Sequence, residues 1–370
     1  MASSRASSRW QLFVPKLVTV LREGYGTADL RADLIAGLTV AIVALPLAMA
    51  LAIASGATPE KGLVAAIIAG FLISALGGSR FQIGGPTGAF VVVVYDVILR
   101  HGYDGLLLAT LMAGVMLILA GWAGLGTFVK YIPQPVVTGF TAGIAVIIFS
   151  SQVKDFFGLP LGTVPAAFLD KWRAIFGAGA IDPATTGVAL AAVAIILGLR
   201  RWRPRWPGFL IAVVLASALV VLAGLKVATI GSTFGALSGA LPWPTLPAFS
   251  LEKAQAVLPS ALTIAFLAGV ESLLCAVVAD GMTGRRHRSN GELVAQGIAN
   301  IASSVVAGLP ATGAIARTAT NVRAGARSPI AGMAHALFLL LFLTTLAPLA
   351  AYIPLAALAA VLMVVAWNMS

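Results

Sequence analysis

Charged residues are scarce in this chain of 370 residues, where Asp, Glu, Lys and Arg together make up 10%. Soluble globular domains carry about 25% of these residues, because a surface in contact with water needs charge. The scarcity therefore excludes an ordinary soluble fold. The hydrophobic share of 59% excludes a disordered chain, which cannot be so apolar. A polytopic membrane protein is the class that remains.

Cysteine and histidine are almost absent as well. The single cysteine, Cys275, excludes a disulfide framework and a cysteine-rich metal site. The three histidines are scattered along the chain, and there is no His-Glu-x-x-His motif and no phosphate-binding loop. We therefore expect no cofactor, no metal and no enzymatic activity. The N-terminal stretch Met1–Val20 also lacks the isolated apolar core of a signal peptide.

The apolar residues occur in long runs of 17 to 25 rather than alternating with polar ones, which predicts helices rather than the strands of a barrel. Runs bounded by charge, Gly or Pro give twelve spans of an all-α polytopic membrane protein. They are 33–55, 60–78, 83–100, 104–126, 133–152, 184–200, 207–225, 257–280, 291–308, 310–323, 328–350 and 354–369.

The basic residues predict the orientation of these spans, because Lys and Arg concentrate in cytoplasmic loops. With a cytoplasmic N-terminus, most of the 24 basic residues fall inside, and one, Arg317, lies within a span. Seven fall outside: Lys61, Arg100, Lys154, Lys171, Arg173, Lys226 and Lys253. This skew accounts for the net charge of +11 without a nucleic-acid partner.

Two short motifs occur twice. Residues 86–90 (PTGAF) are echoed by residues 310–315 (PATGAI), so that Thr87 corresponds to Thr312, and Tyr-Ile-Pro recurs at 131–133 and 352–354. Each pair joins spans that are seven apart, the third with the tenth and the fifth with the twelfth. Because seven is odd, the two copies cross the membrane in opposite directions. This pattern predicts an inverted-topology repeat, as in secondary transporters.

Gly and Pro interrupt the third and tenth spans, which begin with Gly84-Gly85-Pro86 and Gly308-Leu309-Pro310. Proline suits the first turn of a helix, so both spans are predicted to be half-helices that begin inside the membrane after an extended stretch. Two half-helix N-termini near the midplane would direct free N–H groups and positive dipole ends at one point. An anion site is therefore predicted there, against the alternative of two Pro kinks in packed helices.

Glu271 lies in the middle of a span, where a carboxylate must be neutral, paired or functional. It could carry a proton, or it could hold two helices together. Arg317 could bind an anionic substrate bidentately or be the fixed partner of Glu271, and the sequence leaves both open. The offset that maps Thr87 onto Thr312 also maps Pro46 onto Glu271, so residues 45–49 should face the same cavity.

Four stretches carry longer motifs: residues 45–56, residues 271–284 (ESLLCAVVADGMTG), residues 308–321 (GLPATGAIARTATN) and residues 354–369. Together they resemble the sulfate-permease (SulP) anion transporters over about residues 30–370. The second of them is most similar to the bacterial C4-dicarboxylate members of the family.

The resemblance implies fourteen segments in a seven-plus-seven inverted repeat, with segments 1–4 and 8–11 as a core domain and 5–7 and 12–14 as a gate domain. On this chain the divisions would be 1–32 (cytoplasmic N-terminal segment), 33–126 (core), 127–256 (gate), 257–327 (core) and 328–370 (last core helix and start of the gate). Segments 13 and 14 and the cytosolic STAS domain are therefore expected to be missing.

The resemblance also implies a substrate site between the half-helices, with alternating access by movement of core against gate. The implied substrate-binding residues are Leu47, Leu51, Thr87, Gly88, Ala89, Ala316, Arg317 and Thr318. In sodium-coupled members an acid and two hydroxyl side chains are expected, but here Cys275 and Ile315 stand at the hydroxyl positions. Neither suits a hard cation, so proton coupling through Glu271 is predicted instead.

We therefore predict a secondary transporter in the cytoplasmic (inner) membrane of a bacterium, moving a C4-dicarboxylate such as fumarate or succinate with protons. Sulfate, bicarbonate or anion exchange is the near alternative. An anion channel and a polytopic membrane enzyme are the alternatives from other classes. The expected partners are a small anion, protons and the lipid bilayer, and a homodimer is left open.

Overall fold

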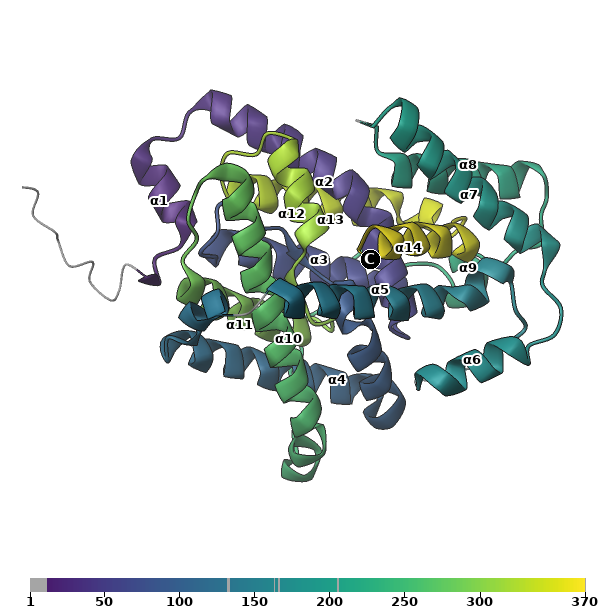
Figure 1. The fold of residues 1–370 in the computed structure, drawn as a ribbon, viewed down its shortest axis with the longest axis horizontal. Coiled ribbons are helices and arrows are strands. Elements are labelled where there is room, and N and C mark those ends of the chain that lie inside the picture. The colour runs from purple at the N-terminus through teal and green to yellow at the C-terminus, as the bar shows by residue number, and fades with distance from the viewer. Residues whose placement is uncertain (1–11, 132–133, 163, 166, 205, 370) are drawn as a thin grey trace, which may run out of the picture.

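The computed structural model describes residues 12–369 except 132–133, 163, 166 and 205. Helices dominate this part of the chain (Figure 1), and its strands are two segments of two residues each. The helices of the first part are α1 (Lys16–Glu23), α2 (Thr27–Ala54), α3 (Pro59–Leu76), α4 (Val91–Trp122), α5 (Gln134–Phe157), α6 (Phe168–Phe176), α7 (Pro183–Trp202), α8 (Gly208–Leu222) and α9 (Ile230–Phe234). Those of the second part are α10 (Leu251–Thr283), α11 (Ser289–Val305), α12 (Ile315–Arg323), α13 (Ile330–Ala350) and α14 (Leu355–Met369).

The predicted spans coincide with these helices, and spans 83–100 and 310–323 begin with extended chain before their helices start. Spans 83–100 and 104–126 are two helices that follow one another within α4 and meet at a kink at Gly102, whose φ of +69° and ψ of 178° are not helical. Glycine adopts this conformation without steric cost, so the chain changes direction there without a loop. Among the described residues, six helices are long and apolar enough to cross a membrane. The chain is therefore a multi-pass membrane protein.

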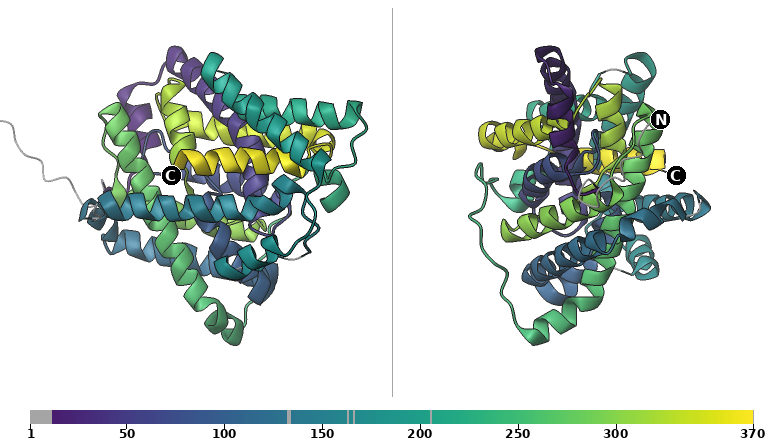
Figure 2. Two further views of the ribbon diagram at one scale, coloured as in Figure 1. Left: turned by 45° about the vertical axis from the view of Figure 1, so that its right-hand side comes forward. Right: turned by 90° about the vertical axis from the view of Figure 1, so that its left-hand side faces the viewer.

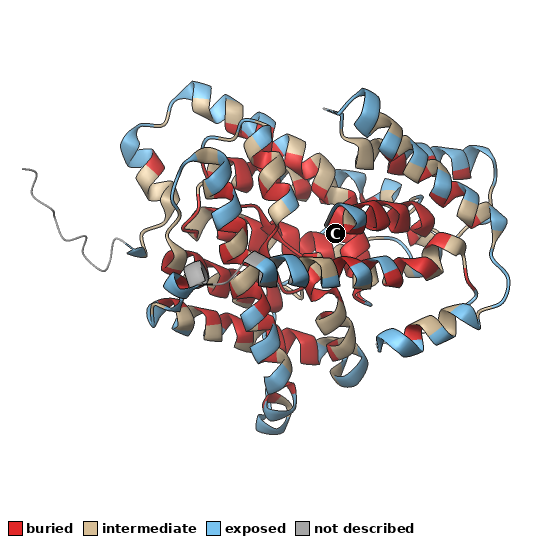
Figure 3. Cartoon of the chain, in the orientation of Figure 1, coloured by how far each residue is buried: buried red, intermediate tan, exposed pale blue. Residues whose placement is uncertain are grey.

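Large apolar side chains are exposed along the outer helices, as expected of a surface that faces lipid rather than water. Leu222 on α8 is 86% exposed, and Phe266 on α10 is 69% exposed. Buried residues concentrate instead where the helices meet in the middle of the molecule (Figure 3). Several of these buried residues are polar, and they surround the two strands.

Helices of the two halves of the chain are interleaved. In the first set, α4 packs on α10 and α11, and α13 packs on α2 and α3. In the second set, α14 packs on α5 and α7, and α7 packs on α8 (Figure 2). The second copy of the Tyr-Ile-Pro motif leads into α14, and Pro354 forms an isolated bridge with Thr229. Residues 132–133 of the first copy lie outside the described residues.

The contact between α4 and α11 depends on two glycines that let the helix backbones approach closely. A Cβ atom on Gly114 would lie 2.7 Å from the carbonyl oxygen of Gly297, and one on Gly297 would lie 2.5 Å from the carbonyl oxygen of Gly114. Real Cβ atoms do not approach backbone so closely, so any larger residue must separate the helices.

We predict that Gly297→Ala lowers the free energy of unfolding by about 1–3 kcal/mol, because the added methyl group forces α4 and α11 apart. Thermal unfolding of the purified protein in detergent measures this change. Gly187→Ala in α7 is the control, because a Cβ there meets nothing within 4 Å. Equal stability of both variants would contradict the close packing of α4 on α11.

Candidate functional site

The two interrupted segments meet as a pair of short antiparallel strands. β1 (Gly84–Gly85) pairs with β2 (Thr312–Gly313), with Gly84 opposite Gly313 and Gly85 opposite Thr312. Beyond β1 a 3₁₀ turn, η2 (Gly88–Phe90), leads into α4, and beyond β2 the chain enters α12 at Ile315. The prediction of two half-helices that follow extended stretches and meet is therefore confirmed.

A cavity of about 360 Å³, the central cavity, lies where these helix starts meet. The first-half residues that line it are Leu47, Leu51, Pro86, Thr87, Gly88, Thr141, Ile144 and Ile148. The second-half residues are Glu271, Leu274, Ala314, Ile315, Ala316, Arg317, Val365 and Asn368. Elements of both sets of helices thus contribute, and most of the lining is apolar.

The structure brings together most of the residues that the sequence assigns to the site. Two of them do not line the central cavity. Ala89 is 7% exposed and belongs to an apolar cluster, and Thr318 is fully buried. The Thr318 hydroxyl oxygen accepts a hydrogen bond from the backbone N–H of Ile83 at 2.9 Å and lies 3.1 Å from the Cys275 sulfur. Thr318 therefore holds the segment before β1 instead of facing the cavity.

Glu271 and Arg317 both line the central cavity, but each has its own partner. The Thr87 hydroxyl donates a hydrogen bond to Glu271 Oε2 at 2.7 Å, which links α10 to the start of the first half-helix. Arg317 Nη2 donates to the Pro86 carbonyl. Among the described residues, no ion pair within 4.0 Å joins Glu271 and Arg317. In this structure Arg317 is therefore not held in an ion pair with Glu271.

The Arg317 guanidinium is buried and only partly satisfied. The residue is 2% exposed, and its Nε and Nη1 atoms have no hydrogen-bond partner among the described residues. A buried unpartnered donor on a charged group is costly, so such a group is a candidate to bind a ligand. Gly85 makes room for it, because a Cβ atom there would lie 2.5 Å from Nη1.

A buried carboxylate that the sequence analysis did not single out, Glu292 on α11, supports the segment before β1. Its Oε2 accepts hydrogen bonds from the N–H groups of Gly78 and Ser79, at 2.9 and 3.2 Å. Its Oε1 accepts from the Ser272 hydroxyl at 3.2 Å and from Gln296 Nε2 at 3.0 Å. The sequence could have identified Glu292, because an acidic residue inside a predicted span (291–308) is costly unless it has partners.

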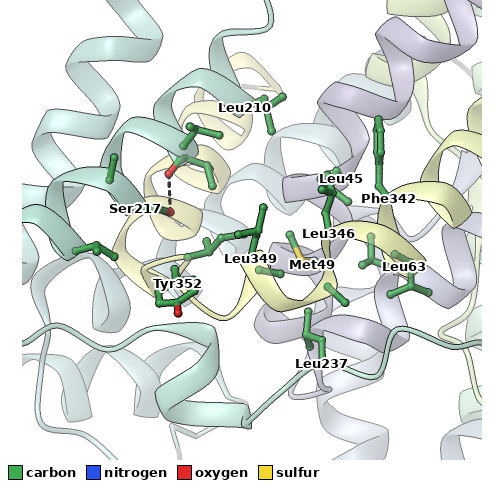
Figure 4. A pocket seen from close by; sticks show the side chains of 18 of the residues that line it. Leu45, Met49, Leu63, Leu210, Ser217, Leu237, Phe342, Leu346, Leu349 and Tyr352 are labelled. Atoms are coloured by element: carbon green, nitrogen blue, oxygen red, sulfur yellow. Dashed lines mark hydrogen bonds between the residues drawn. The ribbon is translucent and has the colours of Figure 1, made fainter.

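A larger cavity of about 580 Å³ lies between α2, α8 and α13, and its chemistry is different. Its lining is almost entirely apolar, including Leu45, Leu346 and Leu349 (Figure 4). The Ser217 hydroxyl points back to the Val213 carbonyl of its own helix at 2.8 Å. A groove with so few polar groups cannot replace the hydration of an anion, so the central cavity is the candidate site.

No group of three or more His, Cys, Asp or Glu side chains that could hold a metal ion occurs among the described residues. The Cys275 sulfur contacts the Thr318 hydroxyl in the packed interior, outside the central cavity. Together these features define a class of fold: a multi-pass helical protein whose two interrupted segments meet beside a cavity has the arrangement of the inverted-repeat secondary transporters. The model of the sulfate permease family matches residues 30–370, and the chain belongs to that family.

Two curated relatives are similar over most of this chain. The putative sulfate transporter YvdB of Bacillus subtilis is 47% identical over 350 residues, which cover 94% of this chain and 66% of the relative. The bicarbonate transporter BicA of a Picosynechococcus species is 33% identical over 345 residues, which cover 90% of this chain and 60% of the relative. The chain therefore spans less than two thirds of the length of these relatives.

Solved structures share the fold. The transmembrane domain of a cyanobacterial bicarbonate transporter, BicA, has a TM-score of 0.86 at 32% identity and covers 93% of this chain and 89% of that one. Murine Slc26a9, an anion transporter in the inward-facing state, has a TM-score of 0.86 at 18% identity, covers all of this chain and 65% of that one, and shows the fold alone. The predicted fold and family are confirmed, and the family is one of transporters rather than enzymes. The narrower similarity to dicarboxylate members stays a prediction.

We predict that Glu292→Ala lowers the free energy of unfolding by about 3 kcal/mol, because two buried backbone N–H groups lose their acceptor. Glu292→Gln, which keeps one oxygen, should lose less. Thermal unfolding in detergent measures both, with Glu252→Ala on exposed α10 surface as the control. Unchanged stability of Glu292→Ala would contradict the supporting role of this carboxylate.

Proposed function

We propose that this chain is the membrane part of a secondary transporter that moves small anions by alternating access. The observation that carries the proposal is the buried Arg317 guanidinium, two of whose nitrogens have no partner among the described residues, at the edge of a cavity where two half-helices begin. The N-terminus of a helix favours negative charge, and a guanidinium binds oxyanions through paired N–H groups. The names of the relatives, sulfate and bicarbonate transporters, support the same class of substrate.

The packing suggests how access could alternate. The central cavity is lined on one side by α2, by η2 at the start of α4, and by α10 and α12, and on the other side by α5 and α14. We propose that the helices on the first side, with α3, α11 and α13, form the core domain and that α5, α7, α8 and α14 belong to the gate domain. Movement of one set against the other would open the cavity to each side of the membrane in turn.

We propose an inorganic oxyanion such as sulfate or bicarbonate as the substrate. The mostly apolar lining removes water from the anion, and the guanidinium and the helix starts replace part of that hydration. Proton-coupled uptake of a C4-dicarboxylate stays a prediction from sequence, as do the bacterial cytoplasmic membrane and the cytoplasmic N-terminus, and the question of a homodimer stays open. Because Glu271 lines the same cavity as Arg317, a proton on its carboxyl would change the net charge of the site by one.

Uptake by the full-length protein in proteoliposomes tests the proposal. Radiolabelled sulfate, bicarbonate and fumarate are compared, each with and without an inward proton gradient. Saturable uptake of sulfate or bicarbonate is expected. Fumarate uptake driven by the gradient would instead establish the dicarboxylate symporter, non-saturating anion flux would indicate a channel, and uptake of none of the three would overturn the proposal.

Arg317→Ala should weaken the apparent affinity for the transported anion about 10- to 100-fold, because it removes charge-assisted hydrogen bonds to the anion. The concentration dependence of uptake measures this effect. Arg323→Ala is the matched control, because Arg323 lies on the same helix, α12, and is exposed. Unchanged affinity in Arg317→Ala protein that keeps its thermal stability would show that Arg317 does not bind the substrate.

Glu271→Gln should abolish any dependence of anion uptake on the proton gradient while leaving gradient-independent exchange of anions, because the amide cannot carry a proton. Uptake and exchange are measured in the same vesicles at several external pH values. Glu252→Gln, an exposed change on the same helix, is the control. Uptake that still follows the proton gradient in Glu271→Gln would exclude Glu271 as the proton carrier.

A further inference from the structure

A third cavity, the outer cavity, has a volume of about 450 Å³ and carries charged side chains. Its lining includes Tyr95 on α4, Ser151, Lys154 and Asp155 near the end of α5, and Lys171 on α6. The predicted topology places this end of α5 on the outer face of the membrane. None of these charged groups lines the central cavity.

Lys171 is the unusual member of this set. Lysine is rarely buried without a partner, yet Lys171 is only 9% exposed. Among the described residues its ammonium has no hydrogen bond or ion pair, and its recorded contact is with the face of the Tyr95 ring, 6.0 Å from Nζ to the ring centroid. Burial lowers the pKa of the Lys171 ammonium. An anion beside it would offset this cost.

The neighbouring charges leave the outer cavity net positive when both lysines are charged. Lys154 Nζ donates one hydrogen bond, at 2.7 Å, to the Gly162 carbonyl, and an ammonium has three donors. Asp155 is the one acid among the described residues of the lining. No ion pair within 4.0 Å joins Asp155 to either lysine in the part of the chain that the structure describes, so its carboxylate does not neutralise them directly.

The outer cavity lies one helical turn beyond the central cavity on the same elements. On α5, Ile148 lines the central cavity and Ser151 the outer one, which is about 4.5 Å further along the helix axis. On the first half-helix, Gly88 lines the central cavity and Val91 the outer one. Ile148 and Val91 are both buried, so apolar side chains separate the two cavities.

The geometry points to the outer cavity as an anion-capture site, in which Lys171 and Lys154 bind the substrate anion before it reaches the central cavity. This inference rests on the proposed function. Its ligand class is the small oxyanion that the full protein transports, held by two ammonium groups rather than by a guanidinium.

Right-side-out membrane vesicles containing the full-length protein test this inference with labelled sulfate or bicarbonate, whichever the wild type takes up. Lys171→Met, which keeps the apolar stem, should raise the KM for uptake from the outer face about tenfold and change the maximal rate little. Lys171→Arg should keep most of the affinity. Lys226→Met is the control, because Lys226 is exposed on the same predicted face and lines neither cavity.

A cysteine variant separates a binding role from a structural one. In Lys171→Cys, reaction with a methanethiosulfonate that adds an aminoethyl group restores a positive charge and should restore the KM. The sulfonatoethyl reagent adds a negative charge and should raise the KM further. The native Cys275 is fully buried, and wild-type protein treated with each reagent measures any effect on the KM that does not come from residue 171.

Wild-type uptake with the same KM in Lys171→Met, or equal effects of the two reagents, would overturn the outer site and leave the proposed function standing. Absence of anion uptake by the wild type would overturn the proposed function itself, and this inference with it.

Discussion

Two helices are interrupted inside the membrane, and the backbone N–H and C=O groups at these interruptions need hydrogen-bond partners. The rest of the structure depends on how those partners are supplied. In an apolar interior each unpaired N–H or C=O costs several kcal/mol, so an extended stretch survives there only with partners. The strands β1 and β2 supply partners to one another. Asn300 supplies more, because its side chain donates to the Ala311 carbonyl at 2.8 Å and accepts from the Ala311 N–H at 2.9 Å. Asn321 donates to the Phe81 carbonyl at 2.9 Å.

The same breaks create the candidate site. Where a helix begins in the interior its first N–H groups lack helical partners, and two such beginnings lie next to the central cavity. The Pro86 carbonyl, freed by the break, positions the Arg317 guanidinium, and the side chain of Thr87 engages Glu271. Charged groups that would be costly in the bilayer are thus placed where backbone dipoles and a cavity surround them.

Much of the fold could be predicted from the sequence, because long apolar runs and Gly-Pro interruptions are strong local signals. The repeated Thr-Gly-Ala motif identifies the two segments that pair, and Leu47 and Leu51 do line the central cavity. The direction of individual side chains on the half-helices could not be predicted. The short helix α12 carries polar side chains on more than one face, among them Arg317, Thr318 and Asn321, so its sequence does not show which of them faces the cavity. The family resemblance assigns Thr318 to the site, but in the structure Thr318 turns away from the cavity.

The side chain that holds the segment before β1 could not be predicted from the sequence either. Glu292, in the second half of the chain, acts through the N–H groups of Gly78 and Ser79, which lie in the first half. Nothing in the local pattern around either segment indicates the other. Spans 83–100 and 104–126, by contrast, could be separated from the sequence, because Gly102 and its neighbouring charges interrupt the apolar run and the structure has a kink there.

The pairing of β1 with β2 has a consequence for how the protein is made. The Ile83 N–H finds its acceptor in Thr318, 235 residues later, so this N–H cannot reach its partner until the ribosome has synthesised most of the second half. Contacts of such long sequence separation form late and slowly. The segment before the first half-helix therefore completes its hydrogen bonds only after the second half of the chain has been made. Membrane insertion and tertiary folding of this chain are consequently one coupled process, in which neither half can be completed before the other.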